Sequence, residues 1–281
     1  ESHTELEALD VEPVIVGVVT RRLGNLLDSA GLDATQIAQH LAEGGACWPA
    51  SVASALEWSA RLRSQGVETR VLVETTTLDI RSGEPAISHV RAAFAAGADV
   101  ITANKGPVAF AYGKLRDEAA AAGVSFRFER AVMDGLPVFN LGRETLPATT
   151  IRGFRGVVNS TTNYILSALE RGEPFDAALV RMQEAGVAEA DPTLDLDGWD
   201  AAAKAAALAN VMLEANHKPH RGAREGVGRG TADRALAARE AGKRLKLVAS
   251  GSGRGAGAVA TVELKELDAG DPLAILDGQA N

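Results

Sequence analysis

The first half of the chain alternates short apolar runs with segments that have the spacing of amphipathic helices. The run "VIVGVV" at 14–19 is rich in β-branched residues and predicts a buried strand. Consecutive parallel strands need a crossover of a dozen or more residues, usually a helix, so this alternation predicts a parallel sheet covered by helices. We expect strands at 14–19, 70–76, 99–105 and 124–129, and helices at 34–43, 51–66, 84–97 and up to Gly123.

The pattern changes after about residue 135. Two late segments alternate apolar and polar residues with a period of two, which predicts an antiparallel sheet with one covered face. The second half should therefore form an α+β domain that follows the α/β domain. We expect strands at 150–158, 245–250 and 258–267, and helices at 161–171, 174–186, 199–213 and 231–242.

Composition excludes several kinds of protein. The 281 residues carry a net charge of −8, so there is no basic surface for nucleic acid. No apolar run is long enough to cross a membrane, and no signal peptide is visible. Cys47 is the only cysteine, which excludes an intramolecular disulfide and favours the cytoplasm. Because the chain starts at Glu1 without a methionine, we expect both ends to be shortened.

The glycine-rich stretch "GSGRGAGA" at 251–258 has the spacing of a dinucleotide-binding loop. That motif needs a helix directly after it, whose N-terminus faces the pyrophosphate. A strand pattern follows here, so we interpret the stretch as a flexible loop between two strands. A phosphate loop would have to precede the strand at 14–19, outside this chain.

Five carboxylates crowd into "EADPTLDLDGWDAAAK" at 189–204. In a calcium loop with Gly198 as the loop glycine, Lys204 would occupy the position of the bidentate carboxylate, which excludes calcium. The helix that follows is apolar on all sides and should be buried. A buried ammonium needs a partner, and Asp200 lies one turn before Lys204. From the pattern alone, a functional lysine and a structural ion pair are equally good interpretations.

Three phrases together resemble homoserine dehydrogenase. They are "ITANKGPVA" at 101–109, "VMDGLPVFNL" with "GVVNSTTNYILSAL" at 132–169, and the acidic stretch at 189–204. The resemblance implies NAD(P)H-dependent, reversible reduction of L-aspartate 4-semialdehyde to L-homoserine, in the biosynthesis of threonine and methionine. It also implies a Rossmann-like nucleotide-binding domain at 1–134, without its first strand and Gly-rich loop. A substrate-binding, catalytic and dimerisation domain with a mainly antiparallel sheet would follow at 135–281.

The resemblance also implies roles for single residues. Lys204 matches the catalytic lysine, placed to give a proton to the aldehyde oxygen, and Lys105 matches a second lysine between nicotinamide and substrate. Acids that bind the substrate's ammonium group and order the site match Glu189, Asp195 and Asp200. Thr76 matches a position that contacts the cofactor. A structural sodium site matches Glu129, Val132, Asp134 and Leu136.

The residues after the strand at 14–19 bear on the choice between NAD(H) and NADP(H). NAD-specific Rossmann domains place an acid after the second strand. Here Arg21 and Arg22 follow 14–19, which favours NADP(H) over NAD(H). The family is commonly dimeric, so we expect a homodimer. Two alternatives are a non-catalytic homologue that binds an amino acid, and an NADP-dependent reductase of a related amino-acid aldehyde.

Overall fold

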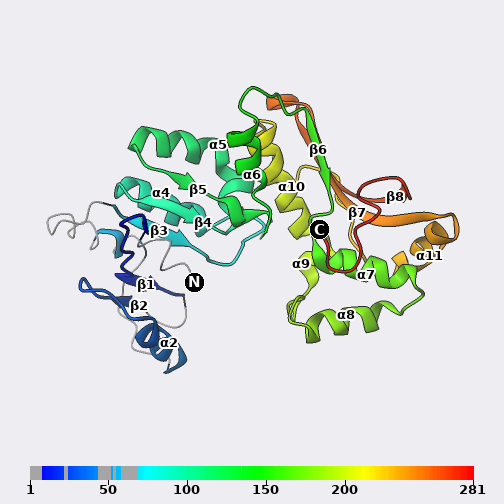
Figure 1. Cartoon of the computed structure of the whole chain (residues 1–281), viewed down its shortest axis with the longest axis horizontal. Coiled ribbons are helices and arrows are strands. Elements are labelled where there is room, and N and C mark those ends of the chain that lie inside the picture. Colours follow the sequence, from blue (N-terminus) through cyan, green and yellow to red (C-terminus); the bar gives the residue numbers. More distant parts are fainter. Residues whose placement is uncertain (1–7, 22–24, 44–51, 53–54, 58–68, 134) are drawn as a thin grey trace.

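The computed structural model describes residues 8–21, 25–43, 52, 55–57, 69–133 and 135–281 (Figure 1). A parallel sheet in the order β3-β4-β5 is formed by β3 (Val71–Glu74), β4 (Asp99–Thr102) and β5 (Phe126–Arg127). An antiparallel sheet in the order β6-β7-β8 is formed by β6 (Gly153–Gly156), β7 (Lys243–Ser252) and β8 (Val259–Asp268). The expected α/β fold with one sheet of each kind is confirmed.

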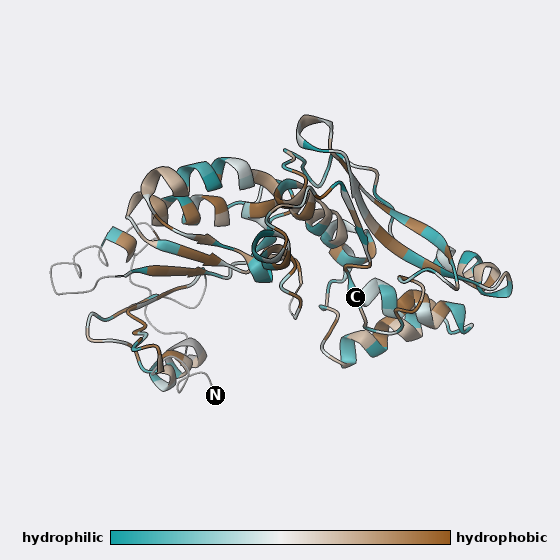
Figure 2. Cartoon of the chain, turned by 45° about the horizontal axis from the view of Figure 1, so that its top comes forward, coloured by the Kyte–Doolittle hydropathy of each residue, from teal (hydrophilic) through white to brown (hydrophobic). Residues whose placement is uncertain are grey.

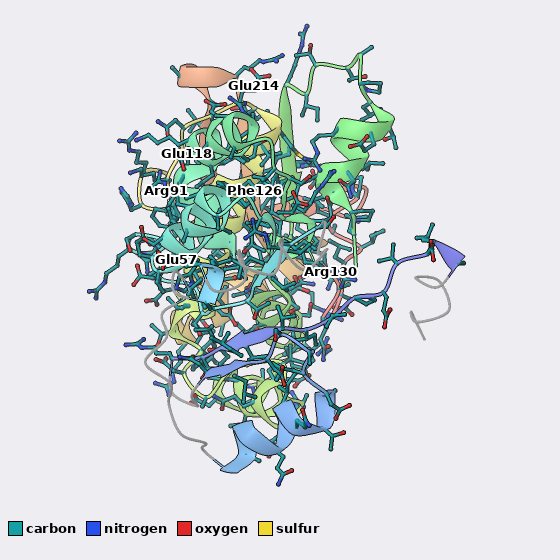
Figure 3. The ribbon with its side chains drawn as sticks, turned by 90° about the vertical axis from the view of Figure 1, so that its left-hand side faces the viewer. Glu57, Arg91, Glu118, Phe126, Arg130 and Glu214 are labelled. Carbon is teal, nitrogen blue, oxygen red and sulfur yellow. The ribbon has the colours of Figure 1, made fainter. Side chains whose placement is uncertain are left out.

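Two helices, α4 (Ala86–Ala95) and α5 (Lys105–Ala122), cover the parallel sheet. Both were expected, and each is followed by a glycine with positive φ, at Gly97 and Gly123, which ends the helix. Their apolar faces bury Val90, Phe94 and Leu115 against Val100 of β4. On the surface, Arg91 of α4 and Glu118 of α5 lie beside each other and form an ion pair (Figure 3).

The structure differs in two ways from the buried strand that was expected at 14–19. Only Gly17–Val19 form a strand, β1, and it pairs antiparallel with β2 (Asn25–Leu27) in a separate two-stranded sheet. Val14 and Ile15 are exposed, so the run is not buried. A short β-branched run does not reveal its pairing partner, and here the partner is the next segment along the chain.

The other N-terminal strands are shorter than expected. The strand expected at 99–105 ends at Thr102, and Lys105 already belongs to α5, while the strand expected at 124–129 is reduced to Phe126–Arg127. Helix α2 (Ala34–Glu43) has the expected bounds. Most of the helix expected at 51–66 lies outside the described residues, although residues 52 and 55–57 are helical. Cys47 and Arg22 also lie outside them.

The second half contains the expected helices and some short elements that the sequence did not reveal. The expected helices are α7 (Ser160–Glu170), α8 (Phe175–Glu184), α10 (Trp199–Met212) and α11 (Ala232–Glu240). The unexpected elements are α6 (Val138–Asn140), η3 (Leu141–Thr145), α9 (Thr193–Leu196), η4 (Arg229–Thr231) and η5 (Gly255–Gly257), and η2 (Glu129–Ala131) just before this half was also unexpected. The glycine-rich stretch, including η5, joins β7 to β8 and precedes a strand, as expected.

Strand β7 differs from the expected strand with one covered face. Residues 245–249 are all buried, and Lys246 among them is fully buried. Since β6 pairs only with the last four residues of β7, the first half of that edge is open to side chains of α7. Glu170 of α7 accepts a hydrogen bond from the Leu245 N–H there. On this central strand, the alternation of apolar and polar residues therefore did not indicate an exposed face.

Helix α10 joins the two halves. It packs against α5 on one side and against β7 and β8 on the other (Figure 1). The buried Asn210 of α10 donates hydrogen bonds to the carbonyls of Val108 and Ala109 in α5. Figure 2 shows hydrophobic segments along the strands and on the helix faces turned toward them. One hydrophobic cluster runs from α5 through α7 and α10 into the antiparallel sheet, so the halves share a core.

Within the described ranges, no helix is both long and apolar enough to cross a membrane. The division of the chain into domains at residues 134 and 135 stays a prediction.

Candidate active site

One carboxylate lies between two lysines that come from different halves of the molecule. The two oxygens of Asp200 lie 3.0 Å from the Nζ of Lys204 and 3.1 Å from the Nζ of Lys105. Lys204 is on α10, one turn after Asp200, whereas Lys105 is the first residue of α5. All three side chains are largely buried, with exposed fractions of 13% for Asp200, 14% for Lys204 and 23% for Lys105.

The start of α10 explains why Asp200 points into this cluster. Gly198 precedes the helix with a φ of 76°, and a Cβ there would meet the Glu225 carbonyl oxygen at 2.3 Å. Only glycine fits both conditions. The turn places Asp200 in the first turn of the helix, where the helix dipole favours a negative charge.

The ammonium group of Lys204 has a second partner. It donates a hydrogen bond of 2.7 Å to the carbonyl oxygen of Val158, in the segment between β6 and α7. An ammonium has three N–H donors, and in the described part of the chain these two contacts account for two of them. One donor is therefore left for an oxygen atom of a ligand.

Asn159 also belongs to the cluster, and the sequence analysis missed it. Its Nδ2 lies 2.8 Å from an oxygen of Asp195 and 2.9 Å from an oxygen of Asp200. Its Oδ1 accepts a hydrogen bond from the Thr162 N–H, so it is the N-cap of α7. The signal was present, because an asparagine before "STTNYILSAL" is a common helix start. Nothing in the sequence, however, shows which carboxylates its NH₂ group meets.

The two carboxylates have opposite electrostatic environments. Burial by itself would raise the pKa of Asp200, but the charges of Lys204 and Lys105, together with Asn159, lower it to about 2. Burial, and next the negative charge of Asp200, raise the pKa of Asp195. Asp200 is thus firmly ionised, whereas Asp195 is the acid that more easily takes a proton.

Thr76 lies at the carboxyl end of the parallel sheet, in a second polar group that the sequence analysis noticed only in part. The buried Glu74 at the end of β3 accepts hydrogen bonds from the Thr76 N–H and the Thr102 hydroxyl. Asn104 donates to the Thr76 carbonyl and accepts from the Gly106 N–H as the N-cap of α5. This group fixes the start of α5 and thereby the position of Lys105.

Polar groups at the carboxyl ends of β3 and β4, beside a helix N-terminus, match where open α/β sheets bind ligands. Thr76 is exposed at this edge, and Lys105 extends from it toward Asp200. The described residues therefore fit part of a nicotinamide dinucleotide site.

The structure does not bring Glu189 into the cluster. It is exposed, and its described contact is made by its backbone carbonyl, which accepts a hydrogen bond from Gln183. Arg21 is exposed just after β1, outside the parallel sheet.

The expected sodium ligands are only partly described, because Asp134 lies outside the described residues. Both carboxylate oxygens of Glu129 accept backbone N–H groups, from Phe139 and Asn140. The Leu136 carbonyl accepts from Val138 N–H, and Val132 is buried. Among the described residues, no group of three or more His, Cys, Asp or Glu side chains could hold a metal ion.

Two cavities lie away from the lysine cluster. One, of about 560 Å³, is next to Arg171, Arg244 and Ile275. The other, of about 510 Å³, lies between α4, α5 and the end of α10. Neither is lined by Lys204, Lys105 or Asp200. The charged cluster of Lys204, Asp200 and Lys105 therefore lies outside both cavities.

Comparison with known proteins gives a consistent picture. The family model for homoserine dehydrogenase matches residues 137–281. The chain is 35% identical over 270 residues to a protein named NAD(+)-dependent homoserine dehydrogenase from Pseudomonas canavaninivorans, covering 95% of this chain and 76% of that protein. It is 40% identical over 183 residues to homoserine dehydrogenase from Methanocaldococcus jannaschii, covering 65% of this chain and 54% of that one.

Solved structures agree with this. A crystal structure of a homoserine dehydrogenase from Thiobacillus denitrificans matches with a TM-score of 0.72 and 32% identity, over 86% of this chain and 54% of that chain. A putative homoserine dehydrogenase from Archaeoglobus fulgidus has the same fold, with a TM-score of 0.80 at 24% identity, over 99% of this chain and 82% of that one. The chain thus spans about half the length of two of these four proteins. On its identity to the Pseudomonas protein over nearly its whole length, this chain belongs to the homoserine dehydrogenase family, NAD(P)-dependent oxidoreductases that act on a CH–OH group.

Proposed function

We propose that this chain catalyses the reversible reduction of L-aspartate 4-semialdehyde to L-homoserine with NAD(P)H. The observation that carries the proposal is the Asp200 carboxylate, which holds Lys204 and Lys105 together from the two halves of the molecule. A cofactor bound at the parallel sheet and a substrate bound near α10 would meet at this point. When bound, the nicotinamide supplies or accepts the hydride.

Lys204 is the proposed proton donor. Its third N–H bonds the aldehyde oxygen, and the proton passes to that oxygen as negative charge develops on it. The contacts to Val158 and Asp200 fix the direction of this N–H, because they occupy the other two donors. In the reverse reaction, neutral Lys204 takes the hydroxyl proton of homoserine. Lys105 adds a second positive charge next to the same oxygen.

The substrate's ammonium group needs carboxylates. Asp195, which shares Asn159 with Asp200, contacts no lysine among the described ion pairs. We propose that Asp195 binds this group as a carboxylate. Glu189 stays a proposed second ligand, although it would have to approach from its exposed position.

The choice of nucleotide rests on the sequence. Thr76 and Lys105 are the proposed cofactor contacts at the sheet edge. Arg21 and Arg22 stay the proposed contacts with the 2′-phosphate of NADP(H), although the strand before them, β1, is not part of the parallel sheet. The Pseudomonas relative, named as an NAD(+)-dependent homoserine dehydrogenase, favours NAD(H) instead. Replacing Arg21 and Arg22 with Asp and Ser should raise the KM for NADPH far more than that for NADH. An unchanged KM ratio would reject these arginines as the determinants.

Three further parts of the proposal rest on the resemblance or on composition. They are a sodium ion held by Glu129, Val132, Asp134 and Leu136, a homodimer, and a cytoplasmic location. Light scattering of the purified protein would test the dimer. A change in melting temperature when sodium replaces a large organic cation would test the ion.

Turnover tests the function as a whole. Homoserine with NADP⁺ or NAD⁺ should produce reduced nicotinamide, followed by its absorbance. Lys204→Ala should lower kcat by about 100- to 10,000-fold, which is the usual range for loss of a general acid or base, and should leave the circular dichroism spectrum unchanged.

The same assay separates the alternatives. Binding of homoserine without any turnover would indicate a non-catalytic homologue. Faster turnover of another amino-acid aldehyde in a substrate panel would indicate a reductase of a related compound. Full activity of Lys204→Ala would exclude this lysine as the proton donor.

A further inference from the structure

The side chain of Asn159 is fully committed to the polar cluster. Asn159 is buried, with 6% of its surface exposed. Both N–H bonds of Nδ2 are used, one toward Asp195 and one toward Asp200. Its Oδ1 accepts from the Thr162 N–H at 2.8 Å and from the Thr162 hydroxyl at 2.9 Å.

These four contacts allow one orientation of the amide. If the group were rotated by 180°, its oxygen would face two carboxylates and its NH₂ would face a backbone N–H. Both arrangements are repulsive, and the buried groups would be left without partners. The hydrogen-bond pattern therefore assigns oxygen and nitrogen without ambiguity.

The neighbouring residue adds a second link to the same site. The carbonyl of Val158 accepts the hydrogen bond from Lys204, so two consecutive residues contact the lysine and both acids. Cap formation at Thr162 ties this dipeptide to the start of α7. The turn between β6 and α7 is thus connected to each charged side chain on the second-half side of the site.

We propose that Asn159 is a positioning residue for the reaction proposed above: its amide holds Asp195 and Asp200 side by side as carboxylates, so that Asp200 keeps both lysines while Asp195 stays available for the substrate's ammonium group. The role given to Asp195 rests on the proposed function, whereas the arrangement of the two acids is independent of it.

The electrostatics explain why such a residue is needed. Two carboxylates in a buried site repel each other, and Asp200 raises the pKa of Asp195. The hydrogen bond from Asn159 acts in the opposite direction on Asp195 and also lowers the pKa of Asp200. Without the amide of Asn159, Asp195 would take up a proton more easily as the pH falls, because it has no lysine partner.

Asn159→Ser is the first test. Serine is a good N-cap, so α7 keeps its start, but serine has one short hydroxyl and cannot reach both carboxylates. The Asp195 carboxyl, followed by carbon-13 NMR, should titrate at higher pH than in the wild type. The acid limb of the kcat/KM profile for homoserine should move to higher pH by the same amount, because only ionised Asp195 binds the ammonium group. We expect kcat/KM at neutral pH to fall by about ten- to a hundred-fold.

Asn159→Asp is the second test. It keeps the cap oxygen but replaces the donor with a third carboxylate beside Asp195 and Asp200. The added negative charge should raise the pKa of the Asp195 carboxyl further, so its titration and the acid limb of the kcat/KM profile should move to higher pH than in Asn159→Ser. A change in folding stability alone does not predict this order of the two variants.

Thr162→Val is the matched control. It removes the hydroxyl contact with Asn159 from the other side of the cap and touches neither acid. It should lower the melting temperature without moving the Asp195 titration. If Asn159→Ser leaves both the titration and the pH profile unchanged, or if Thr162→Val moves them equally, Asn159 only caps the helix and the proposal is wrong. Because the titration needs no turnover, it gives this answer even if homoserine is not the substrate.

Discussion

Lys204 of α10 and Lys246 of β7 are two buried or largely buried lysines of the second half. Each lysine lies on an apolar element, and each ammonium group donates to one backbone carbonyl, that of Val158 for Lys204 and that of Leu276 for Lys246. Helix α7 and its N-cap each supply an asparagine to one of these regions. Asn159 bridges the acids next to Lys204, whereas Asn163 accepts a hydrogen bond of 2.9 Å directly from Lys246.

The two regions differ in the groups that their carboxylates bind. Asp200 contacts Lys204 directly. Near Lys246 the corresponding acid, Glu170, is taken by Arg244 at 2.5 Å and by the N–H of Leu245. Lys246 therefore has neutral partners, and burial, together with the charge of Arg244, lowers its pKa to about 8. Burial of a lysine is thus common to both regions, and the direct contact with a carboxylate distinguishes the candidate site.

The largest expected contrast comes from the same substitution at both lysines. Lys204→Met should lower kcat by about 100- to 10,000-fold, since the proton donor is lost. Lys246→Met should keep kcat within a factor of two or so of the wild type, provided that the protein is folded. Steady-state kinetics of the two variants measure the contrast directly. Equal losses would mean that Lys204 acts through stability and would break the comparison.

Removal of the shared acid should have the next largest effect. Asp200→Asn leaves Lys204 and Lys105 without a carboxylate, and breaking such a buried pair costs about 3–5 kcal/mol. Urea unfolding near neutral pH would measure this loss.

The pH dependence of Asp200 has a defined sign. Its pKa is lower in the folded protein, about 2 against 3.8. Its stabilising contribution is therefore complete above 3.8 and is lost as the pH falls through 2. The difference in unfolding free energy between the wild type and Asp200→Asn should shrink over that range. A constant difference would contradict the assigned ion pairs.

Lys246 should show a pH dependence at the opposite end of the scale. Its pKa is about 8 in the folded protein against 10.5 when unfolded, so the unfolded chain binds more protons between these values. Wild-type stability relative to Lys246→Met should rise by at most about 3 kcal/mol as the pH increases from 8 to 10.5. Thermal unfolding of both proteins across this range would test the sign, and a flat difference would mean that Lys246 stays charged.

The smallest effect is expected for an exposed pair, which serves as the reference for the buried ones. Arg91 and Glu118 are 44% and 39% exposed. A double-mutant cycle with alanine at both positions should give a coupling energy below about 1 kcal/mol, which salt reduces further. A coupling as large as that of Asp200 would remove burial as the explanation for the difference.

The sequence predicted elements where periodicity is long and the ends are marked. Helix α5 ends before Gly123 as expected, and the alanine-rich run around Lys204 is the buried helix that its composition indicated. Strand 14–19 was misassigned because six apolar residues do not specify a partner. Lys246 was placed on a period-two strand, and its burial by α7 and the C-terminal segment depends on contacts distant in sequence.

The candidate site shows the same limit. Asp200 and Lys204 could be paired from their i, i+4 spacing, which is a local property. The contact of Asp200 with Lys105 crosses about a hundred residues of chain and could come only from the resemblance or from the structure. Asn159 and Glu74 were missed for this reason, since each acts on groups that the fold brings near.

The alanines of α10 determine how far apart the two halves stand. Ala203, Ala206, Ala207 and Ala209 are fully buried, and α10 lies directly against α5, the helix that begins with Lys105. Each methyl group acts as a spacer, so a larger side chain would push the helices apart and stretch the distance between Asp200 and Lys105. In a random mutant library, this stretch should tolerate glycine or serine better than valine or leucine, although the latter are more hydrophobic. An activity screen of such a library would thus select on interhelical distance.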